Sequence, residues 1–138
     1  HMAGEPSTMQ VDPHYDDVVG EVCDFLRDRL AVARAAGVEE GWVDPGIGFG
    51  KTTAHNLSLL RHLDQVVALG APVVAGTSRK AFLGAVLGRS DGLDGPAPVD
   101  DRLEGSVATA VWAMTVGAAM VRVHDVLACR QAVAVVAE

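Results

Sequence analysis

Three short apolar runs divide this chain, and each run ends in a cluster of ionisable or glycine-rich residues. The runs cover residues 41–44, 72–76 and 119–123, and stretches with apolar residues at helical spacing lie between them. Strands that alternate with amphipathic helices are typical of parallel βαβ units. Because the carboxyl ends of parallel strands share one edge, where ligands bind in such folds, we expect the three clusters to form one site.

Residues that favour helix ends bound the helical stretches. Apolar residues recur at helical spacing from Asp16 until Gly37, and glycine is common just after a helix. Thr52 or Thr53 can cap a second helix, which we expect to close at Gly70. Further helices are predicted over residues 79–87, 103–117 and 126–137, and loops over residues 1–14 and 88–101.

The composition narrows the class of protein. With 138 residues, 49% of them hydrophobic, the chain fits one globular domain. A net charge of −7 without a basic block argues against a nucleic-acid partner, and no apolar run approaches the roughly 20 residues that span a bilayer. Cys23 and Cys129 lack metal-ligand spacing, as do His14, His55 and His62. We therefore expect reduced thiols, a cytoplasmic protein and no metal site in this segment.

The first cluster, residues 44–51, places an aspartate, three glycines and a lysine directly after an apolar run. Its glycines match neither the phosphate-binding P-loop nor the dinucleotide fingerprint, so they predict a tight turn but no nucleotide site. Lys51 and Lys80 are the only lysines beside nine arginines, and each follows an apolar run. Since arginine supplies the surface positive charge, we expect at least one of these lysines to be functional.

Four side chains after the runs suggest a site for a heterocycle and an anion. Asp44 suits either a structural turn or the acceptance of two N–H groups from a heterocycle. Lys80 stands at a helix start, where its charge opposes the helix dipole, and this favours a ligand role. Arg122 and His124 alternate along a strand end and can hold a phosphate or diphosphate from one side. For His124, a neutral imidazole bonded to a main-chain carbonyl is an equal alternative.

Three motifs in a fixed order resemble the dihydropteroate synthase family. They are Asp44-Pro45-Gly46-Ile47-Gly48-Phe49-Gly50-Lys51, Thr77-Ser78-Arg79-Lys80 and Arg122-Val123-His124-Asp125-Val126. Residues 1–10 resemble that family's loop after the fifth strand. His55 and Asn56 fall where the family has such a pair, although the residues themselves suggest a pair on the surface of a helix. The resemblance covers essentially all of the chain.

The resemblance implies that only part of the family's domain is present. The family folds as a TIM (β/α)8 barrel of roughly 250 residues. This α/β chain would then be the C-terminal half of such a barrel, with about three parallel strands. Residues 1–14 would form the loop after the fifth strand, and residues 15–138 would form strands six to eight with their helices. The first half, whose asparagine contacts Mg²⁺, would lie outside this sequence, whether the chain is truncated, proteolysed or a natural fragment.

The resemblance also implies an activity. The family condenses 6-hydroxymethyl-7,8-dihydropterin diphosphate with p-aminobenzoate to give 7,8-dihydropteroate and diphosphate in folate biosynthesis, and it is the target of sulfonamides. Ala81 replaces a polar residue that many members carry beside the motif lysine. The implied roles are pterin binding by Asp44, Gly76 and Lys80, p-aminobenzoate binding by Phe49, Arg79 and Lys80, diphosphate binding by Arg122 and His124, and catalysis by Lys80 and Arg122.

Two other functions remain open from the sequence. The chain could be a non-catalytic remnant that binds a partner or ligand, or a corrinoid-dependent pterin-binding methyltransferase domain. The Ser-Arg-Lys and Arg-x-His motifs favour the synthase over the methyltransferase. The expected partners are small-molecule substrates. Because a three-stranded piece of a barrel has two unpaired edges, we also expect a homodimer or association with a complementary half.

Overall fold

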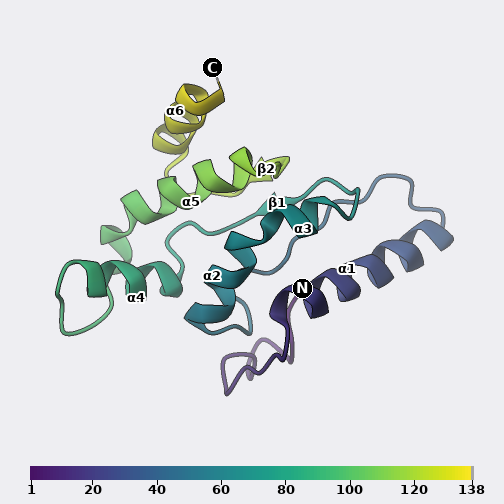
Figure 1. Cartoon of the computed structure of the whole chain (residues 1–138), viewed down its shortest axis with the longest axis horizontal. Helices are drawn as coiled ribbons and strands as arrows, with labels where there is room; N and C mark the ends of the chain where they lie inside the picture. The colour runs from purple at the N-terminus through teal and green to yellow at the C-terminus, as the bar shows by residue number, and fades with distance from the viewer. Residues whose placement is uncertain (138) are drawn as a thin grey trace.

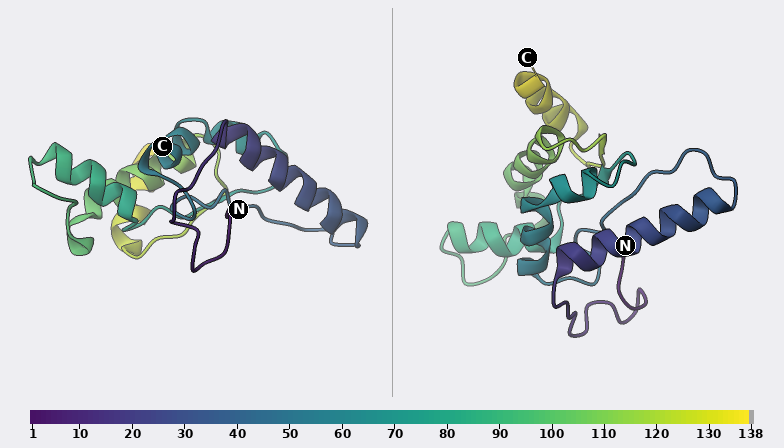
Figure 2. Two further views of the ribbon diagram at one scale, coloured as in Figure 1. Left: turned by 90° about the horizontal axis from the view of Figure 1, so that it is seen from below. Right: turned by 45° about the vertical axis from the view of Figure 1, so that its right-hand side comes forward.

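The structure is a computed structural model that describes residues 1–137, and in that range six α-helices flank a short parallel sheet. Figure 1 shows α1 (Val18–Ala35) and α6 (Val126–Ala137) far apart, with the strands between them. The two views in Figure 2 also separate these helices, so the arrangement is open. The remaining elements are α2 (Thr53–Arg61), α3 (Leu63–Val67), β1 (Val74–Ala75), α4 (Ala81–Ser90), the 3₁₀ helix η1 (Val99–Asp101), α5 (Leu103–Thr115) and β2 (Met120–Val121).

The three apolar runs lie side by side and parallel, as predicted. Strand β1 pairs with β2, so that Val74 faces Met120. On the other side of β1, Val43 forms an isolated parallel bridge with Val73, and the Val74 N–H donates to the Val43 carbonyl at 2.8 Å. The second run is therefore the middle one. Regular pairing is shorter than the predicted runs, because β1 and β2 have two residues each and the first run forms only the bridge at Val43.

Side chains cap the first two helices, at Asp17, which was not predicted as a cap, and at Thr52, which was. The Asp17 side chain accepts the N–H groups of Val19 and Gly20 and so caps α1. Thr52 caps α2 in a reciprocal arrangement, in which its hydroxyl accepts the His55 N–H and the His55 ring accepts the Thr52 N–H. Helix α4 begins later than predicted, at Ala81, and the predicted loop after it contains η1.

The predicted helix from residue 52 to Gly70 is wrong as a single element, because it breaks at His62 into α2 and α3. The break has a tertiary cause. The indole N–H of Trp112, on α5, donates to the Leu60 carbonyl at 2.7 Å. After the break the Gln65 N–H bonds to the His62 carbonyl at 3.1 Å. An interhelical donor thus occupies a carbonyl that a continuous helix would use internally.

The core lies between α1, the α2–α3 pair and the strands. Val22, Leu59, Leu63 and Val66 are each 0% exposed, which shows that the three helices share one apolar layer. Helices α5 and α6 instead keep apolar side chains at the surface. Among the helices of residues 1–137, none combines the length and the apolar character that a membrane span requires. The exposed large apolar side chains of α5, β2 and α6 are Leu103, Trp112, Met120, Val126, Leu127, Val135 and Val136.

Candidate active site

Asp44 stands at the carboxyl end of the first run, directly after the bridge residue Val43. Its Oδ1 accepts the Gly46 N–H at 2.7 Å, and its side chain remains exposed. The sequence left a turn role and a ligand role open for this carboxylate. The structure shows the turn bond, which fixes the direction of the carboxylate while its second oxygen accepts no hydrogen bond within residues 1–137.

The loop that follows, residues 45–50, needs its glycines for two reasons. Gly46, Gly48 and Gly50 have φ values of 70°, 85° and 59°, in the left-handed region that side chains disfavour. Space is also limiting, because a Cβ on Gly48 would lie 2.5 Å from the Cδ of Lys80. Gly48 therefore lets the Lys80 side chain cross the loop.

Side chains hold every carbonyl of this loop from Gly46 to Gly50. Lys51 is only 4% exposed, and its ammonium donates to the carbonyls of Gly46 at 3.0 Å and Phe49 at 3.1 Å. The other three carbonyls accept from Gln10 (to Gly48, 3.0 Å), Tyr15 (to Gly50, 3.0 Å) and Lys80 (to Ile47). The loop is thus held in one conformation without regular secondary structure.

Asn56 was missed as a member of the site region. The expected surface position is wrong, because Asn56 is 2% exposed. Its Oδ1 accepts the Gly48 N–H at 2.6 Å and its Nδ2 donates to the Thr52 carbonyl at 2.8 Å. One sequence signal could have found it, since Asn56 lies at helical spacing from the buried Leu59, Leu60 and Leu63 and so belongs to the inward stripe of the helix.

Lys80 is the N-cap residue of α4, and its side chain turns away from the helix toward the first loop. Its ammonium bonds to the Ile47 carbonyl and lies 4.3 Å from the centroid of the Phe49 ring, a cation–π contact. Burial lowers the pKa of the Lys80 ammonium to about 8, the Asp44 carboxylate raises that pKa, and Arg122 lowers it. Phe49 stays 38% exposed, so it can also face a ligand.

Lys80 and Arg122, the cations that follow the second and third runs, lie close together beside Gly76. A Cβ at Gly76 would lie 3.7 Å from Arg122 Nε and 3.9 Å from Lys80 Nζ. Asp44 is close enough to influence the pKa of Lys80. The structure therefore gathers Asp44, Lys80 and Arg122 at the carboxyl edge of the sheet, as the sequence predicted.

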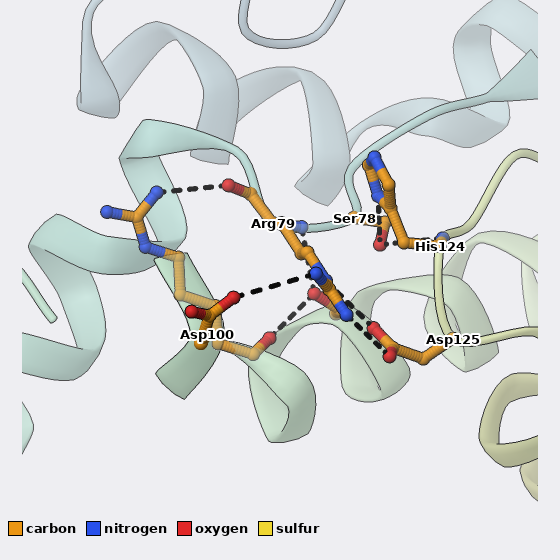
Figure 3. A network of polar contacts seen from close by, with 7 residues as sticks. Ser78, Arg79, Asp100, His124 and Asp125 are labelled. Atoms are coloured by element: carbon orange, nitrogen blue, oxygen red, sulfur yellow. Dashed lines mark hydrogen bonds and ion pairs between the residues drawn. The ribbon is translucent and has the colours of Figure 1, made fainter. Parts of the chain in front are cut away.

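Arg79 is engaged more fully than the sequence indicated. Figure 3 shows its guanidinium against Asp125, to which Nε and Nη2 donate at 3.1 and 2.8 Å. This bidentate pairing lowers the pKa of the Asp125 carboxyl. The Arg79 backbone has a φ of 59° and is fixed by Ser106, which accepts its N–H at 2.9 Å, and by Arg102, which donates to its carbonyl at 3.0 Å. Sequence reasoning missed these three partners, of which only Asp125 follows an apolar run.

The His124 ring contacts a side-chain hydroxyl. The sequence left open a main-chain carbonyl as the alternative to a phosphate ligand. Its backbone N–H donates to Ser78 Oγ at 3.1 Å, and its Nδ1 lies 3.0 Å from the same oxygen (Figure 3). The ring's Nε2 has no hydrogen-bond partner within residues 1–137, and His124 is exposed. Arg122 is exposed and makes no ion pair within residues 1–137. Both groups are therefore available to an anion.

Within residues 1–137, no three histidine, cysteine, aspartate or glutamate side chains gather into a group that could hold a metal ion. The carboxylate nearest the site, Asp44, has cations around it. These described residues do not fit a magnesium site of their own.

Comparison with known proteins gives the family. A family model described as pterin binding enzyme matches residues 1–124. The chain belongs to the pterin-binding enzyme family. The dihydropteroate synthase of Haemophilus influenzae is 44% identical over 131 residues, which are 93% of this chain and 44% of that protein.

Solved structures of the same enzymes also match this chain. Dihydropteroate synthase from Thermus thermophilus in complex with 4-aminobenzoate matches with a TM-score of 0.86 and 44% identity, over 98% of this chain and 53% of that one. The Xanthomonas albilineans synthase in complex with 7,8-dihydropteroate matches with a TM-score of 0.83 and 45% identity, over 91% and 46% of the two chains.

The chain spans about half the length of the relatives that it matches. Its structural neighbours are TIM barrels, so its parallel strands and helices correspond to part of such a barrel. The relatives carry the name of a synthase, and neither the methyltransferase nor the non-catalytic alternative gains support from them.

Proposed function

We propose that this chain supplies the pterin and diphosphate contacts of a dihydropteroate synthase. The complete enzyme condenses 6-hydroxymethyl-7,8-dihydropterin diphosphate with p-aminobenzoate to give 7,8-dihydropteroate and diphosphate. The observation that carries the proposal is the meeting of Lys80 and Arg122 beside Gly76, with Asp44 close enough to raise the pKa of Lys80. Relatives with bound 4-aminobenzoate and 7,8-dihydropteroate support the same substrate class.

The pterin contact rests on the acceptor and donor groups that follow the first two apolar runs. With Oδ1 of Asp44 oriented by the Gly46 N–H, the carboxylate accepts from the amino group and ring N–H of a pterin. Gly76 has no side chain, so the flat ring can lie against the backbone. Lys80 then donates to an acceptor of the ring, and its position over Phe49 places it beside the second substrate.

The diphosphate contact rests on the residues that follow the third apolar run. The reaction breaks the bond between the pterin methylene carbon and a diphosphate oxygen, while the amino nitrogen of p-aminobenzoate bonds to that carbon and loses a proton. Negative charge grows on the diphosphate as the bond breaks. Arg122 and the Nε2 of His124 stabilise that charge, which lowers the barrier.

The p-aminobenzoate contact involves Phe49, Lys80 and Arg79. The exposed Phe49 ring offers a flat apolar surface to the benzene ring. Two donors of Arg79 are taken by Asp125, so contact with the p-aminobenzoate carboxylate falls to Nη1, which lies 3.8 Å from the exposed Asp100.

Three wider features of the complete protein are also proposed. Magnesium would bind through residues outside this chain. A cytoplasmic location suits Cys23 and Cys129, which are both free and buried. Association with a second copy or with a complementary part of the barrel is supported by the exposed apolar side chains of α5 and α6, where Val135 is 78% and Leu127 62% exposed. Sedimentation should show an assembly at micromolar concentration, and a stable, well-folded monomer would contradict this.

The proposed function is tested by reconstitution. The isolated 138-residue chain should make no measurable dihydropteroate, because half of the relatives' length is absent from it. The same segment joined to the missing part of a synthase such as that of Thermus thermophilus should turn over both substrates. Turnover by the isolated chain, or an inactive joined protein that is folded and binds neither substrate, would overturn the proposed site.

A further inference from the structure

The bonds around Ile47 form a pattern that the proposed chemistry does not itself require. Lys51 holds the carbonyls of Gly46 and Phe49, and Asn56 holds the Gly48 N–H. The groups on both sides of Ile47 are therefore tied to buried side chains. The Ile47 carbonyl itself is left to the Lys80 ammonium.

Lys51 and Asn56 are both buried side chains that hydrogen-bond to the loop. They are 4% and 2% exposed, and both bond mainly to the main chain of residues 46–52. Besides these carbonyls, the Lys51 ammonium lies 3.2 Å from the His1 ring and 5.8 Å from the centroid of the Tyr15 ring. Because their polar atoms are engaged by the main chain of the loop, the effect of these two residues on the reaction passes through the loop.

We propose that Lys51 and Asn56 are positioning residues for Lys80, because they fix the Ile47 carbonyl and the Phe49 ring that together hold its ammonium. The Lys80 side chain has little freedom of its own, since it crosses Gly48 so closely that a Cβ there would meet it. A displaced loop would therefore remove the carbonyl and the ring contact at once. The catalytic consequence rests on the proposed function, but the positioning does not.

The chain is well suited to a direct test, because Lys51 and Lys80 are its only lysines. In the 138-residue chain labelled with ¹³C-lysine, NMR should resolve two sets of ε-methylene signals. The Phe49 ring should shift the Lys80 set upfield, and Phe49→Leu identifies it by removing that shift. Asn56→Ala changes no charge and should also abolish most of the shift, as should Lys51→Met. Arg61→Ala, on the exposed face of α2, should leave the shift unchanged. An upfield shift retained in folded Asn56→Ala and Lys51→Met would overturn the proposal.

The unsubstituted chain provides a test that does not depend on whether a variant folds. The Gly48 amide proton should exchange slowly with solvent, because Asn56 accepts it in a buried position. Fast exchange of that proton, or Lys80 signals at their random-coil positions, would overturn the proposal without any substitution.

Kinetics of a complete synthase containing this segment separate the inference from the proposed function. Lys51→Met and Asn56→Ala should each lower kcat about tenfold to a hundredfold with a smaller change in KM, since misplacement of a catalytic group by about 1 Å has effects of this size. Lys51→Arg should restore part of kcat, because a guanidinium can donate to both carbonyls. If Lys80→Ala abolishes turnover while Lys51→Met and Asn56→Ala are fully active, the positioning is overturned and the function stands. If those variants lose the NMR shift while Lys80→Ala is fully active, the positioning stands and the function is overturned.

Discussion

The loops after the first two apolar runs each end in a lysine, yet the two lysines make opposite kinds of contact. Lys51 is almost completely buried, and its ammonium donates hydrogen bonds to carbonyls of its own loop. Lys80 is half-buried and reaches across to the other loop, where a carbonyl and an aromatic ring hold it at the ligand edge. The difference teaches that residue type and position after a strand do not decide a role. The partners that the surrounding structure leaves free decide it.

The electrostatics of the two lysines are nevertheless similar. Burial lowers the pKa of each ammonium to about 8, and the Asp44 carboxylate raises both values. A second cation also lies near each lysine. Lys80 lowers the pKa of Lys51, and Arg122 lowers the pKa of Lys80. A lowered pKa therefore does not by itself separate the functional lysine from the structural one. The two lysines differ instead in their geometry and in their access to a ligand.

The largest expected effect comes from removing the lysine at the ligand edge. In a complete synthase containing this segment, Lys80→Ala should lower kcat on the order of a hundredfold or more with both substrates saturating, since a charged donor at the reacting groups is lost. Steady-state formation of dihydropteroate measures this. Arg61→Ala, on an exposed helical face, serves as the control and should change kcat little. Equal activity of the two variants would remove the contrast between the ligand edge and the outer surface.

Asp44→Asn should have the next largest effect, on affinity for the pterin. The amide replaces one acceptor oxygen by a donor that faces ring N–H groups, and such a mismatch costs about 1–3 kcal/mol, or roughly tenfold to a hundredfold in affinity. Calorimetric titration of the complete synthase with a pterin ligand measures this. An unchanged dissociation constant would show that the Asp44 carboxylate serves only its turn bond to Gly46.

The pH dependence of turnover should sharpen the role of Lys80. Because its pKa is about 8, the ammonium loses its proton as pH rises through that value, and kcat should fall on the alkaline side. Asp44 raises this pKa, so Asp44→Asn should move the alkaline limb to lower pH. The measurement is a profile of kcat from about pH 6 to about pH 10, which brackets that pKa. An alkaline limb that Asp44→Asn leaves in place would assign it to another group.

The smallest expected effect concerns Lys51 and stability. Its pKa is about 8 in the folded chain, below the ordinary value of 10.5, so between these pH values the unfolded chain binds a proton that the folded chain lacks. The free energy of unfolding should therefore rise with pH across that window. Urea titrations at several pH values should show a shallower rise for Lys51→Met than for the unsubstituted chain. Identical slopes would mean that burial does not set the charge of Lys51.

Much of the fold could be predicted from the sequence, because its signals are local. Each apolar run became a parallel segment, and the caps at Asp17 and Thr52 formed as their residue types favour. The helix break at His62 could not be predicted, since its cause is an indole from α5 that is distant in sequence. The local spacing of apolar residues carries no information about a donor from a distant helix.

For the site, the sequence by itself determined which residues gather at the carboxyl edge, because strand ends with glycine and charge leave little choice in a parallel sheet. Only the tertiary structure decided what each one does there. Asn56 is drawn inward by the Gly48 N–H, and Arg79 is held by Asp125. Lys51 is turned into the protein by two carbonyls of the loop. These roles depend on which donors and acceptors remain unpaired once the chain has packed, and no local pattern in the sequence records that.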